Sequence, residues 1–399
     1  MIGKVPDGWR VEKLKDITEF LTCGVAKRPE YVDKKEGIPF LSSKNAKTNR
    51  MILNDYNCVS KEDYEILTKY YKPQRGDILY TRVGSFGEAV VVNVDFDFAV
   101  FVSLTIMRVK SNIVNNHYIS NILNSSFIKQ IANEKARGIG VKNLNVGDVR
   151  DFLIPIPPLP QQEKIVQVLD ISSALVEKQK ELLKKYDLFL KSKFIEMFGD
   201  PISNPMGWEV VKLGNITKVQ TGKTPSRKNA EYWANGTVNW AKTTEVNQTI
   251  MTEVEEKISD LAVKECHMII FQENTILMAM YGQGKTRGKV VLLNVETTIN
   301  QAFCAILASD NFATLYLLKL LDYMYENIRD LGRGGNQENL NLDIVRGINV
   351  ILPPIELQTK FASIVEKIET IKEKETKKLK SLEDLHNTLM QKAFKGEIQ

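Results

Sequence analysis

The sequence repeats itself over most of its length, and this repeat constrains the fold more than any other feature. Several short matches occur in the same order in both halves, with nearly constant spacing between them. They pair residues 8–18 with 207–217, 137–138 with 333–334, 143–145 with 339–341, 149–150 with 345–346, 157–159 with 353–355, and 162–164 with 358–360. Self-similarity that keeps both order and spacing indicates a tandem duplication. We therefore expect two similar domains in one chain.

Each half begins with a globular segment of about 155 residues, which is an ordinary domain size. Short apolar, β-branched runs predict its strands. These runs lie at 37–41, 77–80, 88–92 and 104–107 in the first half, and at 238–240, 275–278, 289–293 and 303–306 in the second. Helical patterns cover residues 118–133 and 312–330. The mixture predicts an α+β fold, and an apolar fraction of 43% lets each half bury a core.

Each half ends in a long helical segment without internal proline or glycine, at residues 161–198 and 356–394. At 1.5 Å per residue such a helix is about 55 Å long. Both helices carry a seam with steps of three and four residues, which is typical of a coiled coil. The predicted interface residues are Ile165, Leu169, Val176, Gln179, Leu183, Leu190, Phe361, Ile364, Ile368, Ile371, Glu375, Leu382, Leu385 and Leu389. The alternative is an amphipathic helix packed on one domain, but a helix of about 55 Å would overhang a domain of this size.

The duplication also predicts how the two helices run. The first helix leaves the first domain and ends at the second, so the second helix should leave the second domain and return to the first. We therefore expect an antiparallel coiled coil, a pseudo-two-fold axis and a C-terminus close to the N-terminus. The predicted division is a first globular domain at 1–155, a central helix at 156–200, a second globular domain at 201–352 and a C-terminal helix at 353–399. Two domains related in this way match the symmetry of two inverted segments of one DNA duplex.

The composition argues against several other classes of protein. No apolar run reaches about 18 residues, so no transmembrane helix is expected, and the first residues do not resemble a secretion signal. Four cysteines without a C-x-x-C pair and three unclustered histidines predict reduced thiols and no metal site. We therefore expect a cytoplasmic protein. The net charge of only +5 means that any DNA-binding surface must come from local clusters of Lys and Arg.

One motif points to a different function. Residues 279–286 fit a relaxed phosphate-loop pattern that ends in Lys285-Thr286. A phosphate loop needs a helix directly after this pair, whereas residues 289–293 predict a strand, and the equivalent stretch 84–87 has no lysine. We therefore interpret the motif as a hairpin loop. No methyltransferase or nuclease motif is found either, which predicts a chain without catalytic residues and without a cofactor of its own.

Loops that follow predicted strands contain the residue types that contact DNA. Arg, Lys, Asn, Gln and Ser read base edges, and Lys and Arg also bind phosphates. The candidates are Ser43, Lys44, Asn45, Arg82, Ser85, Arg137 and Lys142 in the first half, and Lys242, Thr243, Gln283, Lys285, Arg287, Arg333 and Gln337 in the second. For each of them the alternative is an ordinary solvated loop residue. Asn143 and Asn339 are more ambiguous, because turns also favour asparagine.

Two motifs resemble a known family. The opening pattern at residues 6–17, Pro-x-Gly-Trp-x-Val-x-Lys-Leu-x-x-Ile, resembles the start of the specificity subunits of Type I restriction–modification systems, and so does the junction at 154–165. The second half repeats both motifs, the junction more weakly at 356–361. The resemblance therefore covers essentially the whole chain.

This resemblance implies a non-catalytic subunit whose two target-recognition domains each read one part of a bipartite site in double-stranded DNA. It implies that the helices set the spacing of these parts and dock two modification methyltransferase subunits, joined by restriction subunits in the full complex. S-adenosylmethionine, ATP and Mg²⁺ would then be bound only by the partner subunits. A free-standing DNA-binding protein without such partners is the other interpretation left open, and a P-loop ATPase is a weaker third.

Overall fold

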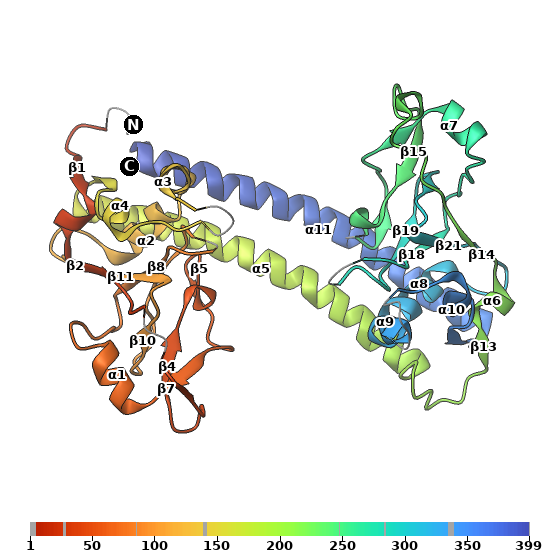
Figure 1. Ribbon diagram of the computed structural model, residues 1–399, viewed down its shortest axis with the longest axis horizontal. Coiled ribbons are helices and arrows are strands. Elements are labelled where there is room, and N and C mark those ends of the chain that lie inside the picture. The colour runs from red at the N-terminus through yellow and green to blue at the C-terminus, as the bar shows by residue number, and fades with distance from the viewer. Residues whose placement is uncertain are drawn as a thin grey trace. The chain divides into compact units, whose positions relative to one another are not determined.

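The computed structural model describes residues 5–26, 29–84, 86–138, 142–246, 248–282, 285–333 and 339–398, with only the backbone at position 333. The chain divides into two compact units. Unit 1 comprises Met1–Lys180 and Lys377–Gln399, and unit 2 comprises Glu181–Thr376 (Figure 1). Each of the two long helices, α5 (Leu159–Phe198) and α11 (Ile355–Lys395), therefore contributes one segment to each unit.

Unit 1 is built around a four-stranded antiparallel sheet. Its strand order is β2 (Thr18–Cys23), β11 (Leu104–Val109), β8 (Ile78–Thr81) and β9 (Ala89–Val91). A second sheet has the order β10 (Ala99–Val100), β4 (Ile38–Leu41), β7 (Asn57–Val59) and β3 (Tyr31–Val32), and two-stranded pairs join β1 (Arg10–Lys13) to β12 (Leu153–Ile156) and β5 (Ala46–Lys47) to β6 (Arg50–Met51). The helices are α1 (Lys61–Leu67), α2 (Asn116–Leu123), α3 (Ser126–Lys135) and α4 (Val146–Arg150).

Unit 2 repeats this plan. Its main sheet has the order β14 (Val219–Thr221), β21 (Phe303–Ile306), β18 (Ile276–Ala279), β19 (Val290–Leu293) and β16 (Ile250–Met251). The smaller sheet has the order β17 (Lys257–Ile258), β15 (Val238–Ala241) and β20 (Thr298–Ile299), and β13 (Val210–Lys212) pairs with β22 (Asn349–Ile351). The helices are α6 (Leu213–Ile216), α7 (Asp260–Glu265), α8 (Thr314–Tyr323), α9 (Tyr325–Asp330) and α10 (Leu342–Arg346). The first four strands of the main sheet follow the same order as in unit 1, so the predicted duplication and α+β class are confirmed.

The matched sequence motifs hold equivalent places in the two units. The side chain of Gln162 is fully buried, accepts a bond from Asn115 N at 2.8 Å and donates to the carbonyl of Pro157 at 2.8 Å. Gln358 is buried in the same way, accepting from Ala313 N at 3.0 Å and donating to the carbonyl of Pro353 at 2.8 Å. Buried amide groups need such partners, so these glutamines recur because they fix the start of each long helix to its own domain.

The predicted helices of the globular segments are each split in two. Residues 118–133 were expected to form one helix, but α2 ends at Leu123 and α3 starts at Ser126. The hydroxyl of Ser125 accepts a bond from Ile128 N at 3.3 Å and so caps α3, as serine commonly does at a helix start. In unit 2 the break falls at Met324, between α8 and α9.

Within unit 1, the start of α5 packs beside the end of α11. Ile165 and Leu169 share one core with Ala393, and the ring of Phe394 lies 5.7 Å from that of Tyr118. Further along α5, Ser172 Oγ lies 2.8 Å from His386 Nδ1. Residue numbers rise along α5 while they fall along α11, so the two segments are antiparallel.

Within unit 2, the end of α5 packs beside the start of α11 with the same polarity. The ring centroids of Phe194 and Phe198 each lie 5.5 Å from that of Phe361, and Lys372 Nζ lies 2.6 Å from Asp187 Oδ1. The predicted antiparallel pairing of the helices is therefore present in each unit. Gly396 also lies against the ring of Pro6 within unit 1, as the predicted return of the chain requires.

The seam of α11 differs from the prediction at two positions. Ile371 and Leu385 are 38% and 49% exposed, so they lie outside the seam. The next residues, Lys372 and His386, turn inward instead: the side chain of Lys372 is 16% exposed and pairs with Asp187 and Glu369. The seam of α11 therefore continues from Ile368 to Lys372, four residues on, rather than to Ile371. Lys372 can lie at the helix interface because its charge is paired with Asp187 and Glu369.

The other predicted interface residues lie on inward faces. Ile165, Leu169, Val176, Gln179, Leu190 and Phe361 are buried, and Leu183, Ile364, Ile368, Glu375, Leu382 and Leu389 are half-buried. Along the described residues, no helix combines the length and apolarity that crossing a membrane would require.

Candidate nucleic-acid interface

Three loops that are far apart in the sequence meet in unit 1. The loop after β4 forms a short 3-10 turn at Ser43–Asn45, and Ser43 N donates to Ser103 Oγ at 3.0 Å. The carbonyl of Ser103 accepts a bond from Arg82 N at 3.0 Å, and the carbonyl of Arg82 accepts one from Leu144 N at 2.8 Å. Ser103 and Arg82 therefore connect Ser43, after β4, with the start of the loop after β8 and with Leu144. Ser103 was not among the predicted residues, because its role depends on the approach of segments that the sequence does not place together.

Arg82 is engaged by the protein itself. Its guanidinium donates to the carbonyls of Leu144 and Val102, both at 3.0 Å, and to Asn143 Oδ1 at 3.2 Å. Asn143 also exchanges two backbone bonds with Arg137, at 3.0 and 2.8 Å. Arg82 therefore holds Asn143 and Leu144 in place, and its direct contact with DNA stays a prediction.

Asn45 is also structural. Its side chain is fully buried, accepts a bond from Ser42 N at 2.9 Å, and donates to the carbonyls of Ile52 at 2.9 Å and Asp55 at 2.7 Å. All of its strong hydrogen-bonding capacity is therefore used inside the loop. The predicted base contact is not supported by this geometry. Asparagine is common both in turns and at DNA, so the sequence alone could not separate the two roles.

The cationic residues of unit 1 fall into two groups. Lys44 Nζ is paired with Asp55 at 2.9 Å, and this pair lowers the pKa of the Asp55 carboxyl through the hydrogen bond from Lys44. Arg137 and Lys142 are exposed, and no ion pair is formed by either within the part of the chain that the structure describes. Arg137 and Lys142 are thus the predicted cations of unit 1 that remain available to an anionic ligand. Ser85 lies outside the described residues.

Unit 2 builds the corresponding loop from different residues. A 3-10 turn at Thr243–Glu245 follows β15, and the carboxylate of Glu245 accepts bonds from Lys242 N and Glu255 N, both at 2.8 Å. Glu245 therefore does what Asn45 does in unit 1. Lys242 Nζ pairs with Glu256 at 2.8 Å and Glu255 at 3.0 Å, and the hydrogen bond to Glu256 first of all raises the pKa of Lys242.

An aromatic cluster lies beside this loop. The guanidinium of Arg227 stacks on Trp233, with its carbon 3.5 Å from the ring centroid, and also pairs with Glu256 at 2.6 Å. Trp233 in turn packs edge-on against Trp240 at the end of β15. Arg227 and Glu256 were missed at the level of the sequence, because they lie on segments without a recognisable motif. Together they fix Lys242 and leave Thr243 half-buried at the surface.

The loop after β18 brings Lys285 and Arg287 to different places. Lys285 is exposed, and its carbonyl accepts a bond from the hydroxyl of Tyr325 on α9 at 2.8 Å. Arg287 is only 7% exposed, so the predicted direct contact with DNA is not supported for it. β19 begins at Val290, so a strand rather than a helix follows Lys285-Thr286 and the rejection of a phosphate loop is confirmed. Gln283 and Gln337, together with the side chain of Arg333, lie outside the described residues.

The described residues offer no cluster of three or more His, Cys, Asp or Glu side chains that could hold a metal ion. Cys58 and Cys304 are buried, and burial raises the pKa of both thiols. Neither thiol is therefore in a setting that favours a reactive thiolate. What the described loops present is a set of polar and cationic side chains at the ends of strands, an arrangement suited to binding an anionic polymer.

Known proteins share this architecture. The type I restriction modification DNA specificity domain matches the chain twice, over residues 6–185 and 205–384. Two relatives from Methanocaldococcus jannaschii, the type I restriction enzyme MjaIX specificity subunit and the putative MjaX specificity subunit, are each 23% identical over the whole of this chain and 95% of their own length. The crystal structure of a Type I restriction–modification S subunit from M. genitalium shares the fold, with a TM-score of 0.57, 15% identity and 98% of both chains covered.

The double match coincides with the duplication. Each matched segment contains the globular part of one half and most of the long helix that follows it. The matches together span far more than half of the chain, in the order that the repeat predicts. The chain therefore belongs to the family of type I restriction–modification DNA specificity subunits, which are non-catalytic DNA-recognition proteins.

Proposed function

We propose that each unit binds one part of a bipartite DNA site through the loops at the ends of its β-strands. The observation that carries this proposal is the meeting of three distant loops in unit 1, with Arg137 and Lys142 exposed and without an ion pair among the described residues. Cations that are not neutralised by nearby carboxylates bind phosphates most strongly, because they release counterions from the DNA. In unit 2, Lys285 is an exposed cation on the loop after β18.

The proposal assigns different tasks to the engaged and the exposed residues. Arg82, Asn45 and Glu245 hold the loops in place, since their polar atoms are used within the protein. The half-buried Ser43 and the exposed Arg137 would then contact phosphates or base edges. Loops presented by a rigid sheet can vary without loss of the fold, which suits a subunit that determines a sequence.

Domain exchange tests this proposal. Residues 1–150 would be replaced by the matching segment of a relative, and preferred sites would be selected from randomised duplexes with the assembled complex. We expect one part of the selected sequence to change and the other to stay the same. A change in both parts would contradict independent reading by the two units.

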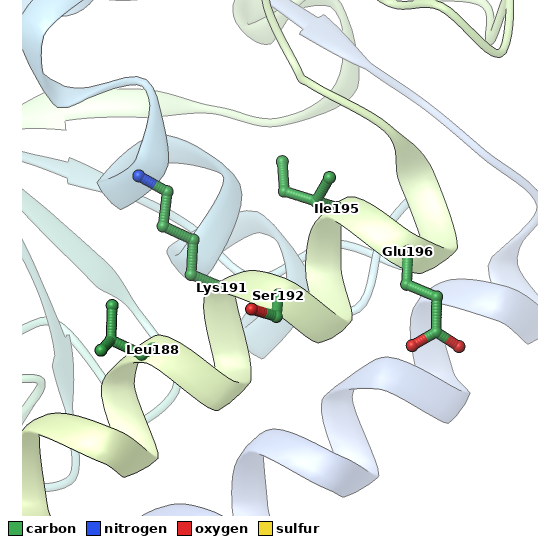
Figure 2. Close-up of a pocket in the computed structure, with 5 residues that line it drawn as sticks. All are labelled: Leu188, Lys191, Ser192, Ile195 and Glu196. Atoms are coloured by element: carbon green, nitrogen blue, oxygen red, sulfur yellow. The ribbon is translucent and has the colours of Figure 1, made fainter.

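We further propose that modification methyltransferase subunits dock on α5, with restriction subunits joining in the full complex. In unit 2, the outer face of α5 carries an open groove of about 470 Å³ lined by Leu188, Lys191, Ser192, Ile195 and Glu196 (Figure 2). Leu188 is 63% exposed, and Phe189 and Ile195 are exposed beside it. Large apolar side chains gathered on one helix face, with charged residues at the rim, are typical of a protein interface.

Replacing Leu188 and Ile195 together by aspartate tests the docking surface. We expect the double variant to lose co-elution with its cognate methyltransferase subunit in size-exclusion chromatography. The matched control is Ile66→Asp, which removes an exposed apolar side chain from α1 and should leave co-elution intact. A double variant that still co-elutes would contradict docking at this face. A chain that stays monodisperse alone, and binds DNA without any partner, would favour the free-standing binder instead.

The cofactors of the system belong to the partners in this proposal. S-adenosylmethionine, ATP and Mg²⁺ would be used by the methyltransferase and restriction subunits, and this chain would bind none of them. The purified chain should therefore show no ATP turnover. Turnover that disappears in a Lys285→Ala variant would contradict this assignment.

A further inference from the structure

The β5–β6 hairpin of unit 1 continues the loop that carries Ser43. Ile52 N donates to the carbonyl of Asn45 at 2.8 Å, and Asn45 Nδ2 donates to the carbonyl of Ile52 at 2.9 Å. These two bonds close the base of the hairpin on the 3-10 turn. Lys47 lies opposite Arg50 in the ladder, and a turn of two residues joins them. The hairpin is therefore an extension of the candidate interface.

One residue of this turn, Asn49, is held by the helix α2. Its φ of 53° lies in the left-handed region, which asparagine adopts more readily than most residues. Asn49 Oδ1 accepts bonds from Ser120 Oγ at 2.8 Å and from Asn124 Nδ2 at 3.0 Å. Asn49 Nδ2 donates to Asn121 Oδ1 at 2.6 Å. The three partners on α2 are buried, so a set of polar groups inside the protein fixes this one side chain.

The rest of the turn is fixed as well. Asn49 N donates to the carbonyl of Ala89 in β9 at 2.8 Å, and Thr48 N donates to Glu88 Oε2 at 3.0 Å. Lys47 Nζ lies 3.5 Å from Glu88 Oε1. The turn is thus bonded to α2, to β9 and to the residue before β9. Its position is defined although its own residues are exposed.

Unit 2 has other residues at these places. Tyr118 of α2 and Tyr316 of α8 are equivalent, because each hydroxyl donates to a carbonyl of the strand that precedes a long helix. Counted from these tyrosines, the three residues that hold Asn49 correspond to Leu318, Lys319 and Asp322. Lys319 pairs with Glu369 on α11, and β16 joins the main sheet in parallel with β19. The anchored hairpin is therefore a feature of unit 1 and not of the shared plan.

Arg50 is the cation that this hairpin presents. It directly follows Asn49, is exposed, and forms no ion pair within the part of the chain that the structure describes. Arginine carries a planar fork of donors that matches O6 and N7 of guanine, and a two-stranded β-ribbon fits into the major groove where these atoms lie. Reading a base requires a side chain held in a defined place. The bonds of Asn49 provide that condition for its neighbour.

We propose that the β5–β6 hairpin of unit 1 enters the major groove and that Arg50 reads a guanine in the part of the site bound by this unit. Asn49 is a positioning residue: it holds the hairpin against α2 and does not touch the DNA. The inference rests on the proposed function, because Arg50 can read a base only if unit 1 binds one part of the site.

The first experiment selects preferred sites from randomised duplexes with the assembled complex. The unaltered protein should select a G·C pair in the part that changes when residues 1–150 are exchanged. In Arg50→Lys we expect the preference for this pair to fall about tenfold, because lysine keeps the charge but loses the fork. Arg50→Ala should lose the preference too. Arg10→Ala, which removes an exposed arginine from β1, is the matched control and should keep every preference.

The second experiment separates base reading from charge and from folding. Arg50→Lys should keep the slope of log affinity against log salt concentration, since the number of neutralised phosphates does not change. Asn49→Gly keeps access to the left-handed backbone but removes the three side-chain bonds to α2. It should weaken the preference at the same base pair, by less than Arg50→Lys does. A loss of folded protein would instead lower the affinity for all duplexes alike.

The outcomes separate this inference from the proposed function. A unit 1 part without a G·C pair, or unchanged preferences in both Arg50 variants, overturns the reading role. An equal loss of affinity for all duplexes in Arg50→Ala identifies a phosphate contact and overturns that role as well. Unchanged preferences in Asn49→Gly overturn the positioning role of Asn49. The proposed function itself fails if exchanging residues 1–150 leaves the selected site unaltered.

Discussion

Individual residues in the strand-end loops divide by whether their side chains turn into the protein or face solvent. Arg82, Asn45 and Arg287 are turned inward, whereas Arg137 and Lys142 face solvent. Residue type alone does not reveal this division, since all five are of the types found at DNA interfaces. The division matters for mutagenesis. Substituting a residue that turns inward changes the conformation of the loop, whereas substituting one that faces solvent changes its contact with DNA.

The solvent-facing residues Arg137 and Lys142 predict how the affinity for DNA depends on salt concentration. If Arg137 and Lys142 each neutralise one phosphate, the double Ala variant should lose about 1.8 from the slope of log affinity against log salt concentration, at about 0.9 per phosphate. Titrations at several salt concentrations measure this slope. Lys61→Ala, an exposed lysine on α1, is the matched control and should leave the slope unchanged. An unaltered slope in the double variant would place the phosphate contacts elsewhere.

At the scale of elements, each long helix is fixed to its own globular part by a buried glutamine and to the other helix by polar contacts. Gln162 and Gln358 make equivalent bonds in the two units. Ser172 and His386 meet between the helices in unit 1, and Lys372 and Asp187 do so in unit 2. Polar groups at such positions commonly fix the register of paired helices.

The two glutamines predict a matched pair of stability changes. Gln162→Leu leaves Asn115 N and the carbonyl of Pro157 without their partner in a buried site. Each unsatisfied group costs about 1–3 kcal/mol, so we expect unit 1 to lose about 2–6 kcal/mol of unfolding free energy. Hydrogen exchange resolved by residue should show the loss in unit 1 only, and Gln358→Leu should show it in unit 2 only. A uniform effect across both units would contradict separate anchoring.

His386 predicts a pH dependence of the helix pair in unit 1. Burial, reinforced by the nearby charge of Lys180, lowers the pKa of His386 below its usual 6.5. The folded chain therefore favours the neutral ring, while the unfolded chain takes up a proton near pH 6.5. This contribution to stability is complete above about pH 6.5 and is lost as the pH falls towards the lower folded pKa. Urea unfolding between about pH 5 and pH 8 should show this loss of stability. In His386→Gln the pH dependence should disappear. Ser172, Lys180 and Glu383 also face this part of the interface.

The sequence predicted most elements but not the details that depend on tertiary contacts. The repeat and the β-branched runs located the main strands, and the absence of Pro and Gly located α5 and α11. The predicted seam of α11 was wrong at Ile371 and Leu385. The prediction assigned apolar residues to the seam and left out Lys372, because the charge of Lys372 is paired with Asp187, which is far away in the sequence. Ser103 and the inward turn of Arg287 could not be predicted either, since only the approach of distant loops determines them.

At the scale of the whole molecule, two similar units share two continuous helices. Each helix segment packs within its unit on residues of that unit. The length of the helices can therefore change without altering either core. If each unit reads one part of the DNA site, as proposed, the length of the helices would set the spacing between the two parts.

Removing one heptad from both helices tests that role. Deleting Val176–Leu182 together with Lys372–Lys378 shortens each helix by about 10 Å and keeps the seam in phase. We expect the preferred spacing to fall by about three base pairs, with weaker binding because the rotation between the two parts also changes. Selection from duplexes of variable spacing measures this. A folded variant that still prefers the original spacing would show that another feature sets the distance.

The core of unit 1 contains Ala393, with Phe394 packed against it, whereas every core residue of unit 2 lies between Leu190 and Val365. During synthesis, the ribosome completes the sequence of unit 2 before it releases the segment that closes unit 1. The core of unit 1 is therefore completed only when residues 377–399 have been synthesised, although N-terminal domains usually fold first. Premature termination or proteolysis near the C-terminus would therefore leave unit 2 intact and unit 1 with an open core.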